Sequence, residues 1–483
     1  MRQLSGLDAG FLTLETPTAP MLIGGLALLD PQTPQGRLDV EAFRALIRRR
    51  LHRAVAFRRV LASLPLDLTR PYWVELPPEE VDLEVHIERT ELPEPGGWHE
   101  LSELMAWELS QPLNRQRPLW QMVFVEGLNS VQGAPEGAVA VLTKVHHAAI
   151  DGVSGAEILS ALFDGLGPED PVPAVAESPA EPPSHPSDAG TLELLAQAGR
   201  DLASIPLAAP RILGRSLLGM AGSALSRLRP GESPPLLFTA PRTPLNRSLG
   251  AERSWFPAFL DLERVKAVKS SQGATVNDVV LAVCAAALRS WLLEGSSLPK
   301  EPLVAMVPVS VRSQDRQKDG GNLVSAMLVS LATDEADPQK RLQRIRDAAR
   351  SSKAAHQAVG AQTLVQSADL LPFALSGLGV RLYSRMHLAE RLRPLFNLVI
   401  TNVPGPPRPL TVGGARLLAH VGAAPLFDGL GLILPVFSYA GRISIGVTAD
   451  RKILPDAQGF ARRLEEALEE LEAAVGSLSS PET

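Results

Sequence analysis

Two adjacent histidines, His146 and His147, are followed closely by an acid and a glycine, Asp151 and Gly152. The valine-rich apolar stretch ahead of them predicts a buried strand, and a Ser-x-x-Glu pattern behind them predicts a helix start. The histidines therefore lie where a strand ends and a turn begins. Because side chains alternate along a strand, we expect the two rings to point to opposite sides. Gly152 would allow a turn that a side chain would block.

Three interpretations fit this stretch. The histidines could be structural, beside a turn aspartate. They could bind a metal, but the sequence has neither His-Glu-x-x-His nor paired cysteines, so we predict no metal site. The third is general-base catalysis, because a neutral imidazole near pH 7 can take a proton from a hydroxyl that attacks a carbonyl. In that case Asp151 either orients a histidine or stabilises the turn through a basic partner. Its short side chain favours the second role.

The pattern from His146 to Gly152 resembles the His-His-x-x-x-Asp-Gly signature of the CoA-dependent acyltransferase superfamily. That superfamily includes chloramphenicol acetyltransferase and the condensation domains of nonribosomal peptide synthetases. Further stretches are similar to the bacterial wax ester synthase/diacylglycerol acyltransferase family. They are 4–11, 20–29, Pro118-Leu119-Trp120, Asn277-Asp278, 308–312, 397–406 and 425–429. The resemblance runs through nearly the whole chain, with these motifs in the family's order.

The resemblance assigns roles to several of these residues. Pro118, Leu119 and Trp120 would shape the site; the alternative is an edge strand with a packed tryptophan. Asn277 would lie near the site, where its amide could stabilise a developing oxyanion. Asp278 is explained by helix capping together with the threonine three residues before it. Arg312 is a candidate salt-bridge partner for Asp151.

The resemblance also implies the fold and the reaction. We expect an α/β (α+β) chain with two chloramphenicol-acetyltransferase-like domains, each a mixed sheet with flanking helices, and a site at their interface. The second histidine, His147, would deprotonate a fatty alcohol or diacylglycerol, which attacks the thioester of acyl-CoA and gives a wax ester or a triacylglycerol. His146 would have a supporting role. No acyl-enzyme forms, so Ser154 is interpreted as a helix cap, and acyl-CoA is a substrate, with no cofactor.

Two other classes of function remain open at this point. One is a different acyltransferase of the superfamily, such as an amide-forming condensation domain, which needs a carrier-protein partner. The other is a non-catalytic protein that binds lipid surfaces through the same fold. The intact histidine motif and the Asn277-Asp278 pair argue against the second class.

Composition limits the class of protein. With 483 residues, 45% of them hydrophobic, the chain is long enough for two domains. A net charge of −6 argues against a nucleic-acid partner. A single cysteine, predicted to be buried and inert, fits a reducing compartment. The first residues lack the apolar core of a signal peptide, so we expect a cytoplasmic protein, with peripheral association at the inner face of the membrane or at lipid inclusions.

The domain boundaries follow from a proline-rich segment. Seven prolines lie between Pro168 and Pro186, which predicts an extended linker. Residues 211–229 then contain four arginines and no acid, which is typical of a helical crossover or of an interfacial helix on anionic lipid. We predict an N-terminal acyltransferase domain at 1–166, a linker with the crossover at 167–235, and a C-terminal acyltransferase-like domain at 236–483.

Local patterns predict individual elements. Asp39 should cap a helix, and the alternation of apolar and polar residues over 82–88 predicts a half-exposed strand. The most lipid-like stretch, Leu417 to Gly441, contains His420 and two prolines, so we predict strands and turns there. The sequence does not set the oligomeric state.

Overall fold

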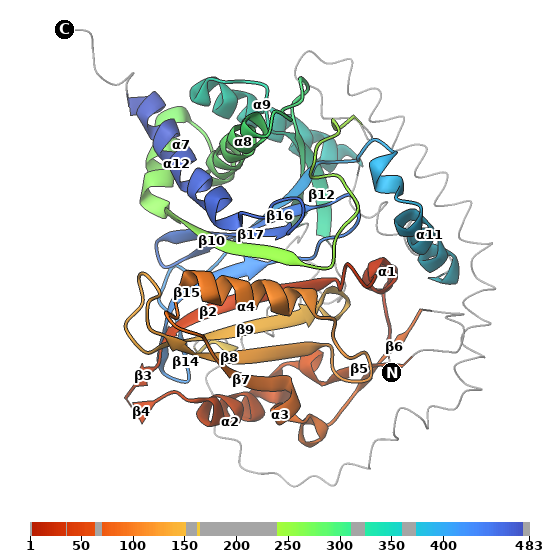
Figure 1. Cartoon of the computed structure of the whole chain (residues 1–483), viewed down its shortest axis with the longest axis vertical. Helices are drawn as coiled ribbons and strands as arrows, with labels where there is room; N and C mark the ends of the chain where they lie inside the picture. The colour runs from red at the N-terminus through yellow and green to blue at the C-terminus, as the bar shows by residue number, and fades with distance from the viewer. Residues whose placement is uncertain are drawn as a thin grey trace.

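Two six-stranded mixed sheets, one above the other in Figure 1, form the frame of the molecule. The computed structural model describes residues 2–34, 36–62, 70–150, 162–164, 239–310, 324–359 and 373–476. The first sheet has the order β14 (Thr411–Val412), β15 (Ala415–Ala423), β2 (Leu22–Asp30), β9 (Ala138–His146), β8 (Trp120–Leu128), β7 (Ile87–Glu91). The second has the order β10 (Arg253–Asp261), β17 (Arg442–Asp450), β16 (Leu432–Tyr439), β13 (Leu398–Pro404), β11 (Val304–Ser310), β12 (Val324–Ser330).

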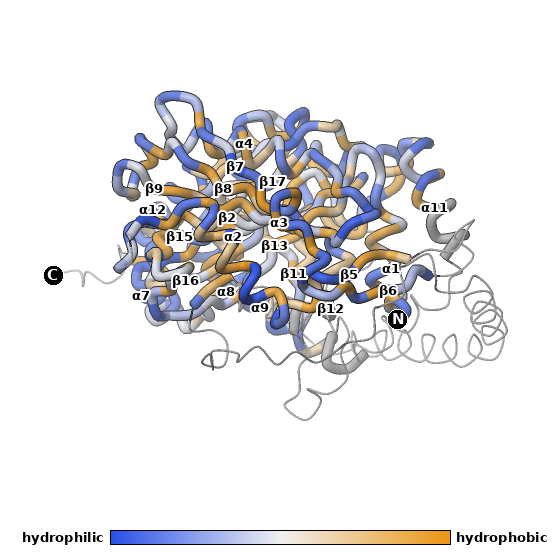
Figure 2. The backbone as a smooth tube through the Cα atoms, turned by 90° about the horizontal axis from the view of Figure 1, so that it is seen from below, coloured by the Kyte–Doolittle hydropathy of each residue, from blue (hydrophilic) through white to orange (hydrophobic). Residues whose placement is uncertain are grey.

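Helices lie above, between and below the two sheets in Figure 1. Their bounds are α1 Gly6–Leu14, α2 Val40–Arg50, α3 Leu83–His86, α4 Trp98–Ser110, α7 Leu262–Gln272, α8 Val276–Glu294, α9 Pro338–Val359, α11 Phe373–Arg385 and α12 Ala457–Gly476. Helices α7, α8, α9 and α12 lie above the second sheet in Figure 1, and α2 and α3 lie below the first. Helix α4 packs against both β2 and β10. In Figure 2 apolar stretches run along the central strands, because strands covered on both faces must be apolar throughout.

Several predicted elements are confirmed together with the contacts that begin them. Helix α2 starts after Asp39, whose Oδ1 accepts a hydrogen bond from Ala42 N at 2.8 Å. The strand predicted before the histidines is β9, which is buried along most of its length. The stretch Leu417 to Gly441 forms β15, a turn and β16 rather than a membrane span.

The half-exposed strand predicted over 82–88 is wrong. Residues 83–86 form the single helical turn α3, and β7 begins only at Ile87. Asp82 Oδ1 accepts a hydrogen bond from Glu84 N at 3.0 Å and so favours a helix start. Leu83, His86 and Ile87 are the buried positions, a spacing of three and four residues that matches one helix face.

The first sheet is not built from the N-terminal half alone. Strand β15 comes from the C-terminal half and pairs antiparallel with β2, with Val421 opposite Leu26. Strand β14 adds to its far side through a two-residue ladder. The ends of the predicted linker lie outside the described residues, so the domain boundaries remain a prediction, but the two halves share this sheet.

The outer edge of β15 is covered by side chains of the second sheet. Tyr439 Oη donates to the carbonyl of Leu417 at 3.1 Å, and Ser444 Oγ donates to that of His420 at 2.6 Å. An indole N–H, Trp255 Nε1, approaches the Gly422 carbonyl at 3.4 Å. These contacts satisfy carbonyls that an uncovered edge strand would expose, and they join the two sheets.

Helix α8 is the one helix in the described ranges that has the length and hydropathy of a membrane span. Of its most apolar window, 67% is buried inside the protein, as in the core helix of a globular domain. Cys284 lies in this helix and is fully buried, and burial raises the pKa of its thiol to about 12. The predicted burial of this cysteine is confirmed, and its inertness remains a prediction.

Candidate active site

Strand β9 brings the two histidines to one end of the first sheet. It lies between β2 and β8, the two neighbours that fix its backbone. The N–H of His146 donates to Leu119 O, and the N–H of His147 donates to Met21 O, each at 2.9 Å. The chain then turns into a short 3₁₀-helix, η5, at His147–Ala149. Backbone bonds on both sides therefore hold the histidines in place.

The Pro118-Leu119-Trp120 stretch supports this strand from the core. All three residues are buried. Trp120 stacks between Phe57 and His86, with 4.4 Å between ring centroids on each side, and its Nε1 donates to Phe57 O at 2.9 Å. Because Leu119 O receives the His146 N–H, the stretch links this aromatic stack to the end of β9.

The ring of His147 stacks on Phe11 of α1, with 3.6 Å between ring centroids and 16° between the planes. Burial lowers the pKa of His147 to about 4, and a contact with its own backbone carbonyl opposes this shift. Its buried Nδ1 makes no hydrogen bond of normal geometry within the described chain. The ring is therefore neutral at pH 7 and held flat against an aromatic face.

His146 faces a different partner. Its side chain is almost fully buried, and its Nδ1 accepts a hydrogen bond from Ala148 N at 3.1 Å. Nε2 therefore carries the proton in the neutral ring, and it lies 3.4 Å from Glu15 Oε2. Arg115 Nε donates to the same carboxylate oxygen at 2.9 Å. The predicted divergence of the two histidines is observed, since each ring meets its own partner.

Glu15 is a charged residue of this site that sequence reasoning missed. Burial alone would raise the pKa of its carboxyl, but the nearby His146 ring and the hydrogen-bonded Arg115 guanidinium outweigh this effect and lower the pKa. Glu15 is separated from His146 by more than a hundred residues, so no local spacing links them. The pairing of β2 with β9 places the end of α1 beside the histidines.

Asn277 and Asp278 lie in the first turn of α8 in the C-terminal half. The predicted capping by Asp278 is confirmed, because Thr275 N donates to Asp278 Oδ2 at 2.8 Å and Asp278 N donates to Thr275 Oγ1 at 3.1 Å. Asn277 Oδ1 accepts a hydrogen bond from Asn402 Nδ2 at 3.3 Å. Asn277 keeps its own amide N–H groups for another partner. No hydrogen bond or ring contact joins it to His147 within the described ranges.

Comparisons with known proteins identify the family of the chain. The family profile described as "Wax ester synthase/diacylglycerol acyltransferase catalytic domain" matches residues 4–280, and that of the "WS/DGAT C-terminal domain" matches residues 320–472. The chain belongs to the wax ester synthase/diacylglycerol acyltransferase family. A protein named as a probable diacylglycerol O-acyltransferase of Mycobacterium tuberculosis H37Rv is 35% identical over 474 residues, which cover 97% of this chain and 98% of the relative.

Solved structures support the fold. The wax ester synthase/diacylglycerol acyltransferase from Marinobacter aquaeolei VT8 is 30% identical with a TM-score of 0.66, covering 98% of this acyltransferase and all of that chain. The first condensation domain of the calcium-dependent antibiotic synthetase is 16% identical with a TM-score of 0.54, covering 98% and 96% of the two chains. The predicted fold of two sheet-rich α/β domains is confirmed, and the chain is an acyltransferase.

Some predicted site residues of this acyltransferase cannot be placed. Asp151, Gly152 and Arg312 lie outside the described residues, as do Ser154 and the arginine-containing segment 211–229. Their roles and the Asp151–Arg312 pair remain predictions. Within the described ranges, no group of three or more His, Cys, Asp or Glu side chains could hold a metal ion.

Replacing Glu15 with alanine should lower kcat roughly tenfold or more, because small displacements of catalytic groups are costly. The change removes the carboxylate that holds His146 and leaves Arg115 without its partner. The measurement is steady-state CoA release at several acyl-CoA concentrations. We expect KM to change little and Glu15→Gln to recover part of the rate. The exposed Glu79→Ala serves as the control, and equal rates in Glu15→Ala and this control would exclude the positioning role.

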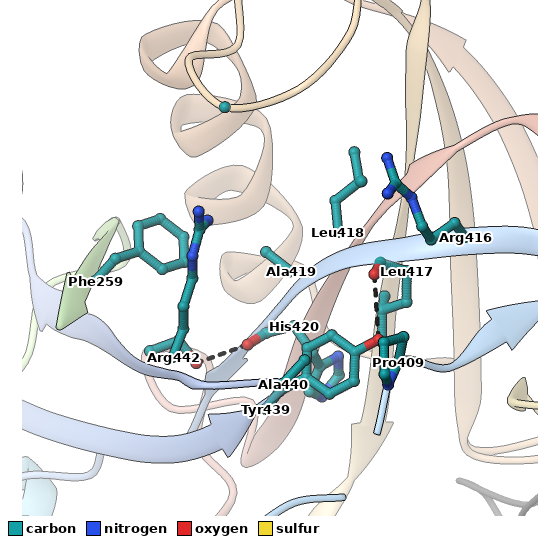
Figure 3. A pocket seen from close by; sticks show the side chains of 12 residues that line it. Phe259, Pro409, Arg416, Leu417, Leu418, Ala419, His420, Tyr439, Ala440 and Arg442 are labelled. Atoms are coloured by element: carbon teal, nitrogen blue, oxygen red, sulfur yellow. Dashed lines mark hydrogen bonds between the residues drawn. The ribbon is translucent and has the colours of Figure 1, made fainter. Parts of the chain in front are cut away.

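A cavity of about 260 Å³ lies beside β15 (Figure 3), and neither histidine of the motif is among its described lining residues. His420 and Tyr439 lie next to each other in it, and Arg416 and Arg442 belong to its lining. The His420 side chain is half-buried, its buried Nδ1 atom has no partner within the described chain, and burial lowers the pKa of the ring to about 4. Its ring contacts Phe437 edge to face, at 4.9 Å between centroids.

His420 should make the folded state sensitive to acid. A histidine in the unfolded chain has a pKa of about 6.5 and is protonated below that pH. In the folded protein, His420 stays neutral until the pH approaches 4. Stability therefore falls as the pH drops from 6.5 towards 4. For a folded pKa of about 4, the loss at pH 4.5 is about 2.5 kcal/mol.

Urea unfolding at pH 7.5 and pH 4.5 measures this loss. Between pH 7.5 and pH 4.5, the free energy of unfolding should fall by about 2.5 kcal/mol less in His420→Gln than in the wild type. The exposed His52→Gln should behave like the wild type. The same fall in both variants would contradict the prediction.

Proposed function

We propose that this acyltransferase moves a long-chain acyl group from acyl-CoA to a fatty alcohol, giving a wax ester, or to diacylglycerol, giving a triacylglycerol. His147 is the general base. The observation that carries this role is a neutral imidazole fixed against Phe11 at the end of β9. A general base must be unprotonated at the working pH, and a half-buried ring with a lowered pKa meets that condition.

The proposed reaction is a direct transfer. The unprotonated ring nitrogen of His147 takes the proton of the acceptor hydroxyl. The resulting oxygen nucleophile attacks the thioester carbonyl, and the C–S bond breaks as the tetrahedral intermediate collapses. The CoA thiolate takes the proton back from His147. The free amide N–H of Asn277 stabilises the oxyanion, while Oδ1 is held by Asn402.

The names of two relatives support the choice of acceptors. The Marinobacter protein is named as both a wax ester synthase and a diacylglycerol acyltransferase, and the mycobacterial protein as a diacylglycerol O-acyltransferase. The mechanism needs no metal and no prosthetic group. Because these acceptors are insoluble in water, we propose that the enzyme works peripherally at the inner face of the membrane or on lipid inclusions.

The test is CoA-thiol release by the purified full chain. Palmitoyl-CoA is the donor, and hexadecanol and dipalmitoylglycerol are offered separately. We expect release that requires an acceptor, and the faster acceptor identifies the preferred product. A burst of one CoA per enzyme without acceptor would indicate an acyl-enzyme and overturn the direct transfer. No acceptor-dependent release with either lipid would overturn the proposed substrates.

A further inference from the structure

Exposed apolar side chains are concentrated in one short segment. Within the described ranges, seven large hydrophobic residues are exposed, and four of them lie between positions 382 and 395. They are Leu382 at 53%, Met386 at 44%, Leu392 at 50% and Leu395 at 40% exposure. Burying such side chains in a protein core would stabilise the fold, so a group of them left in water usually marks an interaction surface.

Leu382 belongs to the last turn of α11, and Met386 directly follows the end of the helix at Arg385. Leu382 and Met386 are four residues apart, and Met386 N donates to Leu382 O, so the helical turn continues through both. Arg381 and Arg385 have the same spacing and are exposed beside them. Tyr383, on the other side of the helix, is only partly exposed. The helix thus turns an apolar and basic face outwards.

Arginines alternate with the apolar residues through the rest of the segment. Arg391 and Arg393 flank Leu392 and are exposed. None of the four arginines forms an ion pair with a described residue, and Glu390 is the one acid between positions 379 and 395. The local charge is positive although the whole chain carries −6. We call residues 381–395 the arginine–leucine surface.

This surface is anchored to the molecule near the histidines. His387 Nδ1 lies 2.9 Å from Ser248 Oγ, and Ala389 is buried. Helix α11, at the right edge of Figure 1, contacts α1. Helix α1 in turn contacts η5 and carries Phe11, which stacks on His147. One helix therefore separates the arginine–leucine surface from the proposed base.

We propose that the arginine–leucine surface docks on an anionic phospholipid bilayer. Its leucines and methionine enter the boundary between headgroups and acyl chains, and its arginines bind lipid phosphates, the two attractions that hold interfacial helices at membranes. Docking there would bring the lipid surface beside α1, where a dissolved acceptor could reach the site. Delivery of the acceptor to the site rests on the proposed function, but binding of the surface to a bilayer does not depend on catalysis.

Vesicle sedimentation of the full chain tests the proposal. The vesicles contain phosphatidylcholine alone or with about 30% phosphatidylglycerol, whose negative charge the arginines should recognise. We expect binding to the anionic vesicles that weakens with added salt. Leu382→Ser/Met386→Ser should weaken it at least roughly tenfold. Arg391→Gln/Arg393→Gln should weaken it roughly fivefold for each arginine.

A matched control uses apolar residues exposed elsewhere. Trp107 and Leu293, on α4 and α8, are 58% and 50% exposed, so Trp107→Ser/Leu293→Ser should bind like the wild type. His147→Ala should also bind normally, which separates docking from the chemistry. Wild-type binding by the Leu382→Ser/Met386→Ser variant would overturn the proposal. A second result would also overturn it. In that case the wild type does not bind vesicles, light scattering shows that it is a dimer, and the Leu382→Ser/Met386→Ser variant is a monomer.

Discussion

Replacing His147 with alanine should lower kcat/KM for acyl transfer by roughly 10²–10⁴-fold, the usual contribution of a general base. The ring is half-buried, neutral and stacked on Phe11, and alanine removes the group that would accept the proton. The variant should keep its melting temperature within a few degrees, since the change leaves the backbone bonds of His147 in place. Acceptor-dependent CoA release measures the rate.

His146→Ala is the control for this prediction. His146 lies against Glu15 and bonds the N–H of Ala148, so its loss should reduce the rate less. An equal loss in both variants would show that the assignment to His147 is wrong. The pH profile gives a second check. Only neutral His147 can accept a proton, so kcat/KM should fall as the pH decreases through about 4, with no loss from this group between pH 5 and 8.

Gly446→Ala should destabilise the fold by about 3 kcal/mol or more, the upper part of the range for overpacking. A Cβ at Gly446 would lie 1.8 Å from the carbonyl oxygen of Gly422, and no rotamer change can relieve a clash with backbone. Strands β17 and β15 would have to separate, which also weakens the contact between Trp255 and Gly422 O. Thermal unfolding of the purified variant measures the loss.

The neighbouring Gly422→Ala is a matched control at the same junction. Its Cβ would meet Pro435 Cβ at 3.3 Å, a contact that a small shift can relieve. We therefore expect Gly422→Ala to melt close to the wild type and Gly446→Ala to melt well below it or to fail to fold. Equal melting temperatures for Gly446→Ala and the wild type would contradict the close approach of the two strands.

Features set by neighbouring residues could be predicted from the sequence. The caps at Asp39 and Asp278 depend on residues three positions apart, and the end of β9 at the histidines depends on a short apolar run. The same local reasoning failed over 82–88, where Leu83, Val85 and Ile87 alternate with polar residues as in a strand. A capping aspartate and the burial of His86 favoured the helix there.

Features set by distant pairing could not be predicted. Nothing near Glu15 points to His146, because sheet pairing alone brings them together. The placement of β15 in the first sheet is of the same kind, since its sequence fits any buried strand. The bond between Asn402 and Asn277 also joins residues far apart in the chain. The resemblance identified the family, but not these partners.

The late arrival of β15 has a consequence for synthesis on the ribosome. Strand β2 ends at Asp30 and its outer neighbour begins at Ala415, so about 385 residues must be translated before that neighbour exists. At the usual elongation rates this takes roughly 20–80 s. During that time the nascent chain presents the apolar β2 with one edge unpaired, a template for aggregation. We therefore expect polypeptides released before residue 423 to need chaperones or degradation, even though they already contain both histidines.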